Sequence, residues 1–322
     1  MAPQVLVIGS AGQIGTELVP LLRSRYGNDK VVAAIHRASG NPSLLSGPVE
    51  VLDVAEASAL ASLIKKCKID TVYHLAALLS ATGETNPQLA WQVNVDGLRN
   101  VLEVARANGV SRVFWPSSIG VFGPDAPRAN APQNAPLNPT TMYGVTKVAG
   151  ELLCNYYFLK YDLDVRCLRF PGLISSEAPT GGGTTDYAVE IFYAALRQGR
   201  YSCFLREDTV LPMMYMPDAL DATVRFMEAD GRRASRHLGY NLAAVSFSAG
   251  ELATEIKKHL PGFTATYSPD SRQSIADSWP MSIDDSEARR DWGWAHQYDL
   301  PRMTADMLSK LGPRLTAKAK SV

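Results

Sequence analysis

The first twenty-five residues restrict what this chain can fold into more than any other stretch of it. Val5–Ile8 is a continuous apolar run, as expected of a parallel strand buried on both faces. It leads directly into a glycine-rich stretch, residues 9–15, and an amphipathic segment follows at residues 16–25. A strand, a glycine turn and a helix in this order bring backbone N–H groups and a helix N-terminus up to a pyrophosphate. The chain of 322 residues is long enough for one large α/β domain, here a Rossmann-type doubly wound parallel sheet, with a smaller C-terminal substrate-binding lobe.

Each glycine of the turn has a separate expected use. Gly9 permits the tight turn, Gly12 the close approach of phosphates, and Gly15 close contact of helix and strand. Gln13 and Ile14 lie between the last two glycines and are expected beside the cofactor. The spacing is G-x-x-G-x-x-G rather than G-x-G-x-x-G, and a purely structural turn is the alternative. The strand before the turn and the helix after it favour dinucleotide binding.

Charge and cysteine content narrow the class of partner. Lys and Arg number 32, as do Asp and Glu, so no basic field exists to hold nucleic acid or an anionic membrane. A small-molecule partner is expected instead.

The apparent strand at Val5 leaves no room for a signal peptide, and no apolar run approaches membrane-spanning length. The cysteines form no C-x-x-C pair, which favours reduced thiols in a cytoplasmic protein over a disulfide framework or a metal site; they are Cys67, Cys154, Cys167 and Cys203.

Two strand ends are expected to meet the adenosine. Val31–Ile35 reads as the second strand, and Arg37 follows it. An acidic residue there would bind a ribose 2′-OH, whereas an arginine accommodates a 2′-phosphate, so Arg37 favours NADP on the simple rule. The side chain can equally lie flat against the adenine. Residues 49–52 read as the third strand, and Asp53 after it either accepts a hydrogen bond from the adenine amino group or caps a helix at 55–66, two compatible roles.

The fourth strand, residues 71–75, ends in the small residues Ala76 and Ala77. Small side chains at the carboxyl end of a strand let a cofactor lie against the sheet, where ligands of open α/β sheets bind. We expect His74 to be packed in the strand end rather than catalytic. Ser80 opens the next loop and places a hydroxyl near any substrate that follows the cofactor.

The next two segments add a second polar group and the fifth strand. Residues 87–108 have helical apolar spacing and include Asn94. This amide binds the cofactor ribose, bridges to the active site, or only turns toward solvent. Residues 112–116 read as the fifth strand, followed by Ser117 and Ser118.

Tyr143 and Lys147 are four residues apart, so their side chains are neighbours on one face of a helix. A phenol titrates near a pKa of ~10, and a fixed positive charge beside it lowers that pKa toward the value a neutral-pH base needs. Taken alone, this spacing occurs by chance too often to carry a function.

The order of these features is what makes them specific. A glycine turn after strand one, Leu-Ala-Ala after strand four, Ser-Ser after strand five and Tyr-x-x-x-Lys in the next helix resemble the extended short-chain dehydrogenase/reductase superfamily, over nearly the whole chain. Ser118 lies 25 positions before Tyr143, which is similar to the spacing in the sugar-nucleotide epimerases of that branch. The resemblance implies that Ser118, Tyr143 and Lys147 are the catalytic set.

The second half of the chain separates the family members. Residues 165–169 read as a sixth strand, and the loop 170–174 looks like the family's loop against the nicotinamide. Residues 181–188, Gly-Gly-Gly-Thr-Thr-Asp-Tyr-Ala, precede a helix to Gln198, and their exposed N–H groups would suit a small carboxylate. A sugar-nucleotide enzyme would need a basic and roomier lobe here; Arg200 and Arg206 keep that option open.

Residues 181–188, Ser80, 279–286 and 291–294 together look like the short-chain type of L-threonine 3-dehydrogenase, a resemblance that extends from Pro3 to about Lys310. It implies that Tyr143 is the base for the threonine β-hydroxyl, with Ser118 as its hydrogen-bond partner. Lys147 would bind the nicotinamide ribose and lower the pKa of Tyr143. Trp279 either shields a closed pocket or only packs in the lobe. The implied substrate-binding residues are Ser80, Ser118, Tyr143, Thr184, Thr185 and Trp279.

The resembled family uses NAD, which conflicts with the simple interpretation of Arg37. We expect NAD, because Asp53 remains for the adenosine and a single arginine does not build a phosphate pocket. The expected cofactor contacts are Gly9, Gly12, Gln13, Ile14, Gly15, Arg37, Asp53, Val54, Leu75, Ala76, Ala77, Asn94, Tyr143, Lys147 and Ile174.

The predicted reaction is oxidation of L-threonine by NAD to 2-amino-3-oxobutanoate, without a metal. The alternatives are an NDP-sugar epimerase or dehydratase and a catalytically silent dinucleotide-sensing module, although the latter predicts loss of the Ser, Tyr or Lys. We expect a dinucleotide-binding domain at 1–175, to which 212–245 returns, and a substrate lobe at 176–211 and 246–322. The segments 89–107 and 147–161 are apolar on more than one face, which predicts a homodimer through a four-helix contact, as in the resembled family.

Overall fold

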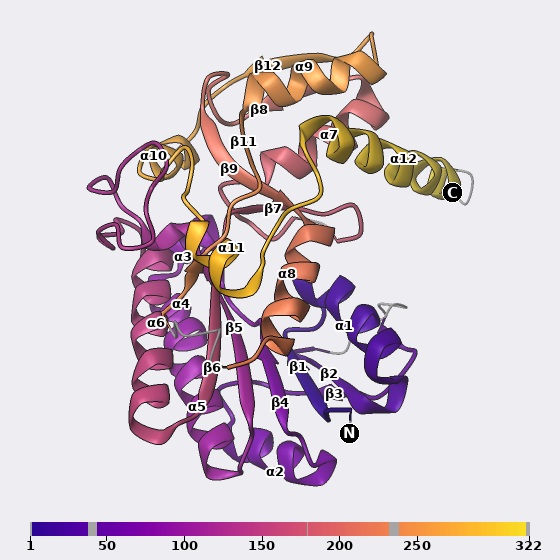
Figure 1. The fold of residues 1–322 in the computed structure, drawn as a ribbon. Coiled ribbons are helices and arrows are strands. Elements are labelled where there is room, and N and C mark those ends of the chain that lie inside the picture. Colours follow the sequence, from indigo (N-terminus) through magenta and orange to yellow (C-terminus); the bar gives the residue numbers. More distant parts are fainter. Residues whose placement is uncertain (1, 38–43, 179, 232–237, 320–322) are drawn as a thin grey trace.

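A parallel sheet of seven strands, in the order β10-β6-β5-β4-β1-β2-β3, forms the centre of the structure, a computed structural model that describes residues 2–37, 44–178, 180–231 and 238–319 (Figure 1). From β1 the strands follow in sequence order in both directions, as in a doubly wound Rossmann sheet. The predicted fold class is therefore confirmed. The strands are β1 (Val5–Ile8), β2 (Val31–Ile35), β3 (Val49–Val51), β4 (Thr71–His74), β5 (Arg112–Ser118), β6 (Asp164–Phe170) and β10 (Tyr240–Asn241).

Helices cover both faces of this sheet, which is why its strands are apolar without alternation. Val5 and Val7 of β1 belong to one buried cluster with α1 and α8, while Leu6 and Ile8 belong to another with α2, α5 and α6. Cys154 and Cys167, distant in the sequence, contact each other in that second layer, and all four cysteines are free. The helices are α1 (Gln13–Tyr26), α2 (Ala57–Cys67), α5 (Gly97–Ala107), α6 (Met142–Tyr161) and α8 (Met216–Glu228), with short 3₁₀ turns η1 (Asn28–Lys30) and η4 (Ile119–Val121).

The segment expected to be one helix at 87–108 is interrupted. A π-helical turn, η3 (Gln92–Asp96), separates α4 (Pro87–Trp91) from α5. Such turns occur mostly as single insertions in α-helices, frequently at functional sites. Asn94 lies in this turn. Ser80 was expected in a loop, and this was wrong, since Ser80 is the first residue of α3 (Ser80–Thr85).

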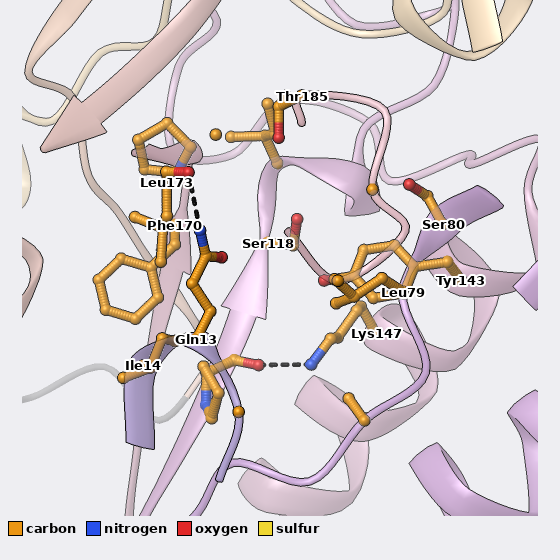
Figure 2. A pocket seen from close by; sticks show the side chains of 18 of the residues that line it. Gln13, Ile14, Leu79, Ser80, Ser118, Tyr143, Lys147, Phe170, Leu173 and Thr185 are labelled. Carbon is orange, nitrogen blue, oxygen red and sulfur yellow. Dashed lines mark hydrogen bonds between the residues drawn. The ribbon is translucent and has the colours of Figure 1, made fainter. Parts of the chain in front are cut away.

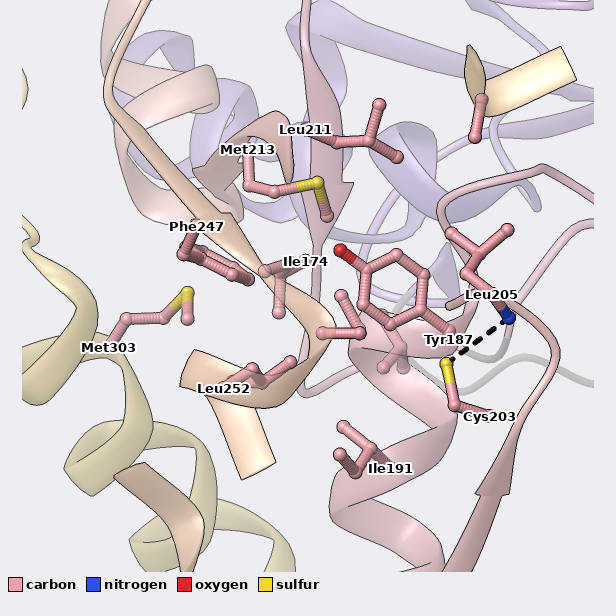
Figure 3. Packing of buried hydrophobic residues seen from close by; sticks show 14 of the residues in the cluster. Ile174, Tyr187, Ile191, Cys203, Leu205, Leu211, Met213, Phe247, Leu252 and Met303 are labelled. Atoms are coloured by element: carbon pink, nitrogen blue, oxygen red, sulfur yellow. Dashed lines mark hydrogen bonds between the residues drawn. The ribbon is translucent and has the colours of Figure 1, made fainter. Parts of the chain in front are cut away.

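A smaller lobe lies above the carboxyl ends of the central strands (Figure 1). It has its own apolar core, which includes Tyr187, Met213, Phe247, Leu252 and Met303 (Figure 3). Its strands are β7 (Gly172–Ile174), β9 (Val210–Tyr215) and β11 (Val245–Ser248) in one sheet, and β8 (Arg200–Cys203) and β12 (Thr264–Tyr267) in another. The helices of the C-terminal half are α7 (Tyr187–Gln198), α9 (Ala249–His259), α10 (Arg272–Asp277), α11 (Ser286–Trp292) and α12 (Leu300–Ala319).

The chain passes between the two parts several times. After β9 it returns to the central sheet, where α8 packs beside α1 and β10 pairs with β6. Trp292 and Trp294 also belong to the apolar cluster of α1 and α8. Across the described ranges, no helix is long and apolar enough to cross a membrane.

Candidate active site

A cavity of about 250 Å³ lies between the carboxyl ends of the central strands and the small lobe. This is where ligands of open α/β sheets bind. Figure 2 shows side chains from both parts of the molecule facing it. Its lining consists of Gly9, Gly12, Gln13, Ile14, Gly15, Leu75, Ala77, Leu79, Ser80, Pro116, Ser117, Ser118, Ile119, Tyr143, Lys147, Phe170, Pro171, Gly172, Leu173, Gly181, Gly183, Thr184, Thr185, Asp186 and Trp279.

The glycine turn forms one wall, and its geometry fits a diphosphate. Gly9 has φ +83°, and a Cβ there would lie 2.7 Å from the Ala76 nitrogen. A Cβ on Gly15 would lie 2.6 Å from the Gly9 oxygen, so both positions require glycine. Gly12 is the N-cap of α1; no side chain caps this helix end, and its first turn contains no acidic residue. The N–H groups of Gln13, Ile14 and Gly15, which precede the first helical hydrogen bond from Thr16 to Gly12, are therefore available to an anion.

Arg37 and Asp53 lie at the outer edge of the sheet, outside the lining of the cavity. Asp53 remains exposed; Nε2 of His36 lies 3.4 Å from its Oδ2. The helix-cap alternative for Asp53 is not what the structure shows. Its Oδ1 accepts a hydrogen bond from the Ala55 N–H at 2.9 Å, but α2 begins two residues later, with Glu56 as its N-cap.

Asn94 does not turn toward solvent. It is 1% exposed, its Oδ1 accepts a hydrogen bond from the Leu78 N–H, and its Nδ2 donates to the Leu78 carbonyl and the Thr146 hydroxyl. The amide therefore joins the loop after β4 to α6, one residue before Lys147, and both of its N–H groups are used within the protein. These contacts support the bridging alternative and contradict a side chain turned toward solvent.

Three other expected contacts lie behind the cavity wall. Ile174 is fully buried in the core of the small lobe, and its neighbour Leu173 faces the cavity because side chains alternate along β7. Val54 is buried against Gly97, and Ala76 contributes backbone beside Gly9. His74 is fully buried, and burial lowers its pKa to about 3, so the ring is neutral at neutral pH.

Helix α6 carries the tyrosine and the lysine into the cavity (Figure 2). The hydroxyl of Thr141 accepts a hydrogen bond from the Gly144 N–H at 3.1 Å, and Oε1 of Glu84 accepts one from the Met142 N–H. These two contacts satisfy free N–H groups at the helix start. Tyr143 is 9% exposed and Lys147 2%, so both lie in a poorly hydrated environment.

The expected lowering of the phenol pKa is not present in the protein alone. Burial raises the pKa of Tyr143, and only the hydrogen bond with Ser118 opposes it. Nζ of Lys147 donates to the Pro116 carbonyl at 2.6 Å and lies 4.4 Å from the centre of the Trp115 ring, against 5.5 Å for the Tyr143 ring. Burial lowers the pKa of Lys147 to about 8. Ser118 is therefore the direct partner of the phenol, and the ammonium acts from further away.

A row of short polar side chains forms the opposite wall. The hydroxyls of Ser80 and Thr184 lie 3.0 Å apart, and the Thr184 N–H donates to the Ser80 hydroxyl. The expectation that the glycine amides at 181–183 are exposed for a carboxylate is wrong for two of them. The N–H groups of Gly182 and Gly183 both donate to Oδ2 of Asp186 at 2.8 Å.

Asp186 is the carboxyl group in the lining of the cavity to which the sequence reasoning gave no role. Burial raises the pKa of its carboxyl, while the two glycine N–H groups lower it. Its position directly after Thr184-Thr185 and before a helix was a usable signal, because aspartate is common at helix starts. Trp279 is 4% exposed and lines the cavity; Arg128 donates hydrogen bonds to its carbonyl and to that of Asp277.

Comparisons with known proteins agree with this geometry. Residues 5–243 match the model of the NAD dependent epimerase/dehydratase family. An uncharacterized epimerase/dehydratase of Staphylococcus haemolyticus is 51% identical over 96% of this chain and 97% of its own length. The mitochondrial L-threonine 3-dehydrogenase of Sus scrofa is 48% identical over 95% of this chain and 82% of its own. The holo form of a GalE-like L-threonine dehydrogenase from Cupriavidus necator superposes with a TM-score of 0.94, at 49% identity over 96% of this chain and 100% of the other.

Proposed function

This chain belongs to the NAD-dependent epimerase/dehydratase family, and we propose that within it the chain oxidises the β-hydroxyl of L-threonine to 2-amino-3-oxobutanoate with NAD. One observation carries the substrate assignment: Tyr143 and Ser118 face a small cavity whose far wall is made of hydroxyls and one carboxylate. Such a wall can hold the charged groups of an amino acid. It offers no cation for a second diphosphate. Arg206 is paired with Asp277, and Arg200 lines a separate groove on the small lobe.

The roles follow from the contacts. The glycine turn and the open N-terminus of α1 hold the diphosphate of NAD, which when bound accepts the hydride from the threonine β-carbon. Tyr143 takes the hydroxyl proton, and Ser118 hydrogen-bonds the same oxygen. Lys147 holds positive charge behind the phenol and binds the ribose. We place the amino acid's carboxylate at the hydroxyls of Ser80, Thr184 and Thr185, and its ammonium at Asp186, with Trp279 excluding water.

Mixing the protein with NAD and L-threonine should produce NADH, followed by its absorbance. The same assay with 3-hydroxybutanoate, which keeps the reacting hydroxyl but lacks the ammonium, should give a kcat/KM lower by about tenfold or more, because Asp186 then stays buried without its partner. NADP should be the poorer cofactor. Absence of NADH with threonine, together with turnover of a UDP-sugar, would replace this proposal by the epimerase alternative.

We also propose a homodimer through α4, α5 and α6. Seven of the nine large exposed hydrophobic side chains in the described part of the chain lie on α4 and α6, and Leu159 is 72% exposed. Contiguous exposed apolar surface of this kind marks interaction sites. One similar solved structure, 47% identical, is described as monomeric, so the state needs measurement. The seven are Leu89, Trp91, Val145, Leu152, Tyr156, Leu159 and Tyr161.

Light scattering at micromolar concentration should give the mass of two chains. Leu159→Glu should give one chain, because it places a charge in an apolar contact at little cost to the free monomer. Leu45→Glu, at an equally exposed leucine outside these helices, is the matched control and should remain dimeric. A parent protein that elutes as one chain would contradict the proposal.

Two further assignments stay proposals. We propose the division into a dinucleotide-binding domain, 1–175 with 212–245, and a substrate lobe, 176–211 with 246–322; the return of α8 and β10 to the central sheet supports it. We propose a cytoplasmic location, supported by the four free cysteines.

A further inference from the structure

An ion pair lies buried one helical turn beyond Lys147, between Glu151 of α6 and Arg169 of β6. Nε of Arg169 donates to Oε1 of Glu151, and Nη2 donates to Oε2, both at 2.8 Å. The side chains are 1% and 3% exposed. A buried pair of this kind is weak grounds for stability, since well-packed apolar residues often replace it at no loss. Its contacts therefore need another explanation.

The first set of contacts leads to the reacting groups. Oε1 of Glu151 also accepts a hydrogen bond from the Ser117 hydroxyl at 2.6 Å. Ser117 stands beside Arg169 in the register of β5 and β6. It lies between Pro116, whose carbonyl holds Nζ of Lys147, and Ser118, the partner of the Tyr143 phenol. The pair thus fixes the end of β5, from which Pro116 contacts Lys147 and Ser118 contacts Tyr143.

The second set leads to the residues that cover the cavity. Nη1 of Arg169 donates to the Gln133 carbonyl at 3.0 Å and to Oδ1 of Asn241 at 3.2 Å. Nδ2 of Asn241 donates in turn to the Asp284 carbonyl. Residues 131 and 283 form a β-bridge, so the segment 279–284, which begins with Trp279, is held against this network.

We propose that the Glu151–Arg169 pair is a positioning unit, which sets the strand end at 116–118 against α6 and holds the segment 279–284 over the substrate. It touches neither substrate nor cofactor and acts through Ser117 and Asn241. The role rests on the proposed function, because it concerns the same reaction. The glycine turn, which would hold the diphosphate, makes no contact with the pair. NAD affinity should therefore respond to the pair only through Lys147 and stay within a few-fold of the parent.

Replacing both charged side chains separates an effect on the position of the reacting groups from an effect on the stability of the protein. In Glu151→Met/Arg169→Met no unpaired charge remains, so the protein should fold. The melting temperature should be lower than that of the parent, because Ser117, Gln133 and Asn241 each lose a buried hydrogen-bond partner. We expect kcat for threonine to fall about 10–100-fold, the loss that a displacement of about 1 Å brings, with a higher KM for threonine and a Kd for NAD within a few-fold of the parent. A purely structural pair predicts parental kcat in the folded double variant, and that result would overturn the proposal.

Ser117→Ala keeps the test decisive if the double variant does not fold. It removes one hydroxyl and leaves Glu151 bonded to Arg169, so folding should be preserved. We expect kcat to fall roughly three- to tenfold, part of the worth of a hydrogen bond to a charged group. An unchanged kcat here rejects the link to the strand end by itself.

The matched control is an ion pair within β6, between Asp164 and Arg166 at the amino end of the strand, where Asp164 also pairs with Arg112. Asp164→Asn/Arg166→Met should alter melting but leave kcat and the KM for threonine as in the parent. The parent's own rate with threonine reports on the proposed function, and the ratio of each variant to that rate reports on the pair. Failure of the proposed function and failure of the positioning role therefore give different experimental results.

Discussion

Tyr143→Phe should lower kcat for threonine oxidation by about 10²–10⁴-fold, the usual contribution of a positioned acid–base group. The substitution removes one oxygen from a buried ring that is held by the helix cap at Thr141 and the neighbouring Gly120. The shape of the site is therefore retained, and only the proton acceptor is lost. Steady-state rates with threonine, and NAD binding by calorimetry, measure the two effects separately; NAD affinity should stay within a few-fold of the parent, since the glycine turn is untouched.

Tyr157→Phe is the matched control for this variant. It lies on the same helix and is similarly buried, and its hydroxyl donates to Glu103 of α5 near the C-terminal end of α6, whereas the cavity lies at the N-terminal end. It should keep full activity. If Tyr143→Phe kept most of its activity, the base would have to be another group, and the whole arrangement around α6 would need a different explanation.

The parts of the fold that follow from local sequence were predictable. The apolar run Val5–Ile8, the glycine turn and the helix after it appear in the structure at nearly the expected positions, because a strand buried on both faces cannot alternate. The spacing of Tyr143 and Lys147 put both side chains into one cavity for the same reason: helical geometry is local.

The parts that failed depend on contacts between distant segments. The pKa of Tyr143 follows from the burial of its ring, which no spacing reveals. The amides of Gly182 and Gly183 were judged free because a glycine run exposes its N–H groups, but the nearby Asp186 binds both. The cofactor contact expected at Ile174 was assigned to a loop, but residues 172–174 form β7, in which Leu173 lines the cavity and Ile174 is buried.

The Glu151–Arg169 ion pair also combines a feature that local sequence predicts with one that depends on contacts between distant segments. Glu151 follows Lys147 by four residues, so its place on the same helix face could have been noted. Its partner could not, because Arg169 reaches it only through the pairing of β5 with β6 and of β6 with α6. A residue that positions a reacting group is identified from the pairing of strands in the structure. The reacting group itself can be identified from residue spacing in the sequence.

Lys147→Met should shift the pH dependence of threonine oxidation to higher pH. In the parent, kcat/KM should rise with pH as Tyr143 loses its proton. Burial pushes that loss to higher pH, since it raises the pKa of the phenol. Nζ of Lys147 lies 5.5 Å from the centre of the Tyr143 ring, and its charge is not among the causes that set the phenol pKa in the protein alone. We therefore expect removal of the ammonium to move the rising limb upward by about one unit, the low end of the effect of a nearby positive charge. At a fixed pH below the limb, the rate then falls about tenfold, since each unit is tenfold.

The shape of the parent profile adds an independent check. The pKa of Lys147 is lowered to about 8 by burial, so the ammonium is present below pH 8 and lost above it. The stabilisation of the phenolate by this charge should therefore be lost as pH rises through 8. The plot of kcat/KM against pH should bend at that pH in the parent and rise without a bend in Lys147→Met. Lys160→Met, at an exposed lysine on the same helix, should reproduce the parent profile. An unmoved limb in Lys147→Met would mean that Ser118 alone prepares the phenol, and that the lysine serves only to bind the ribose.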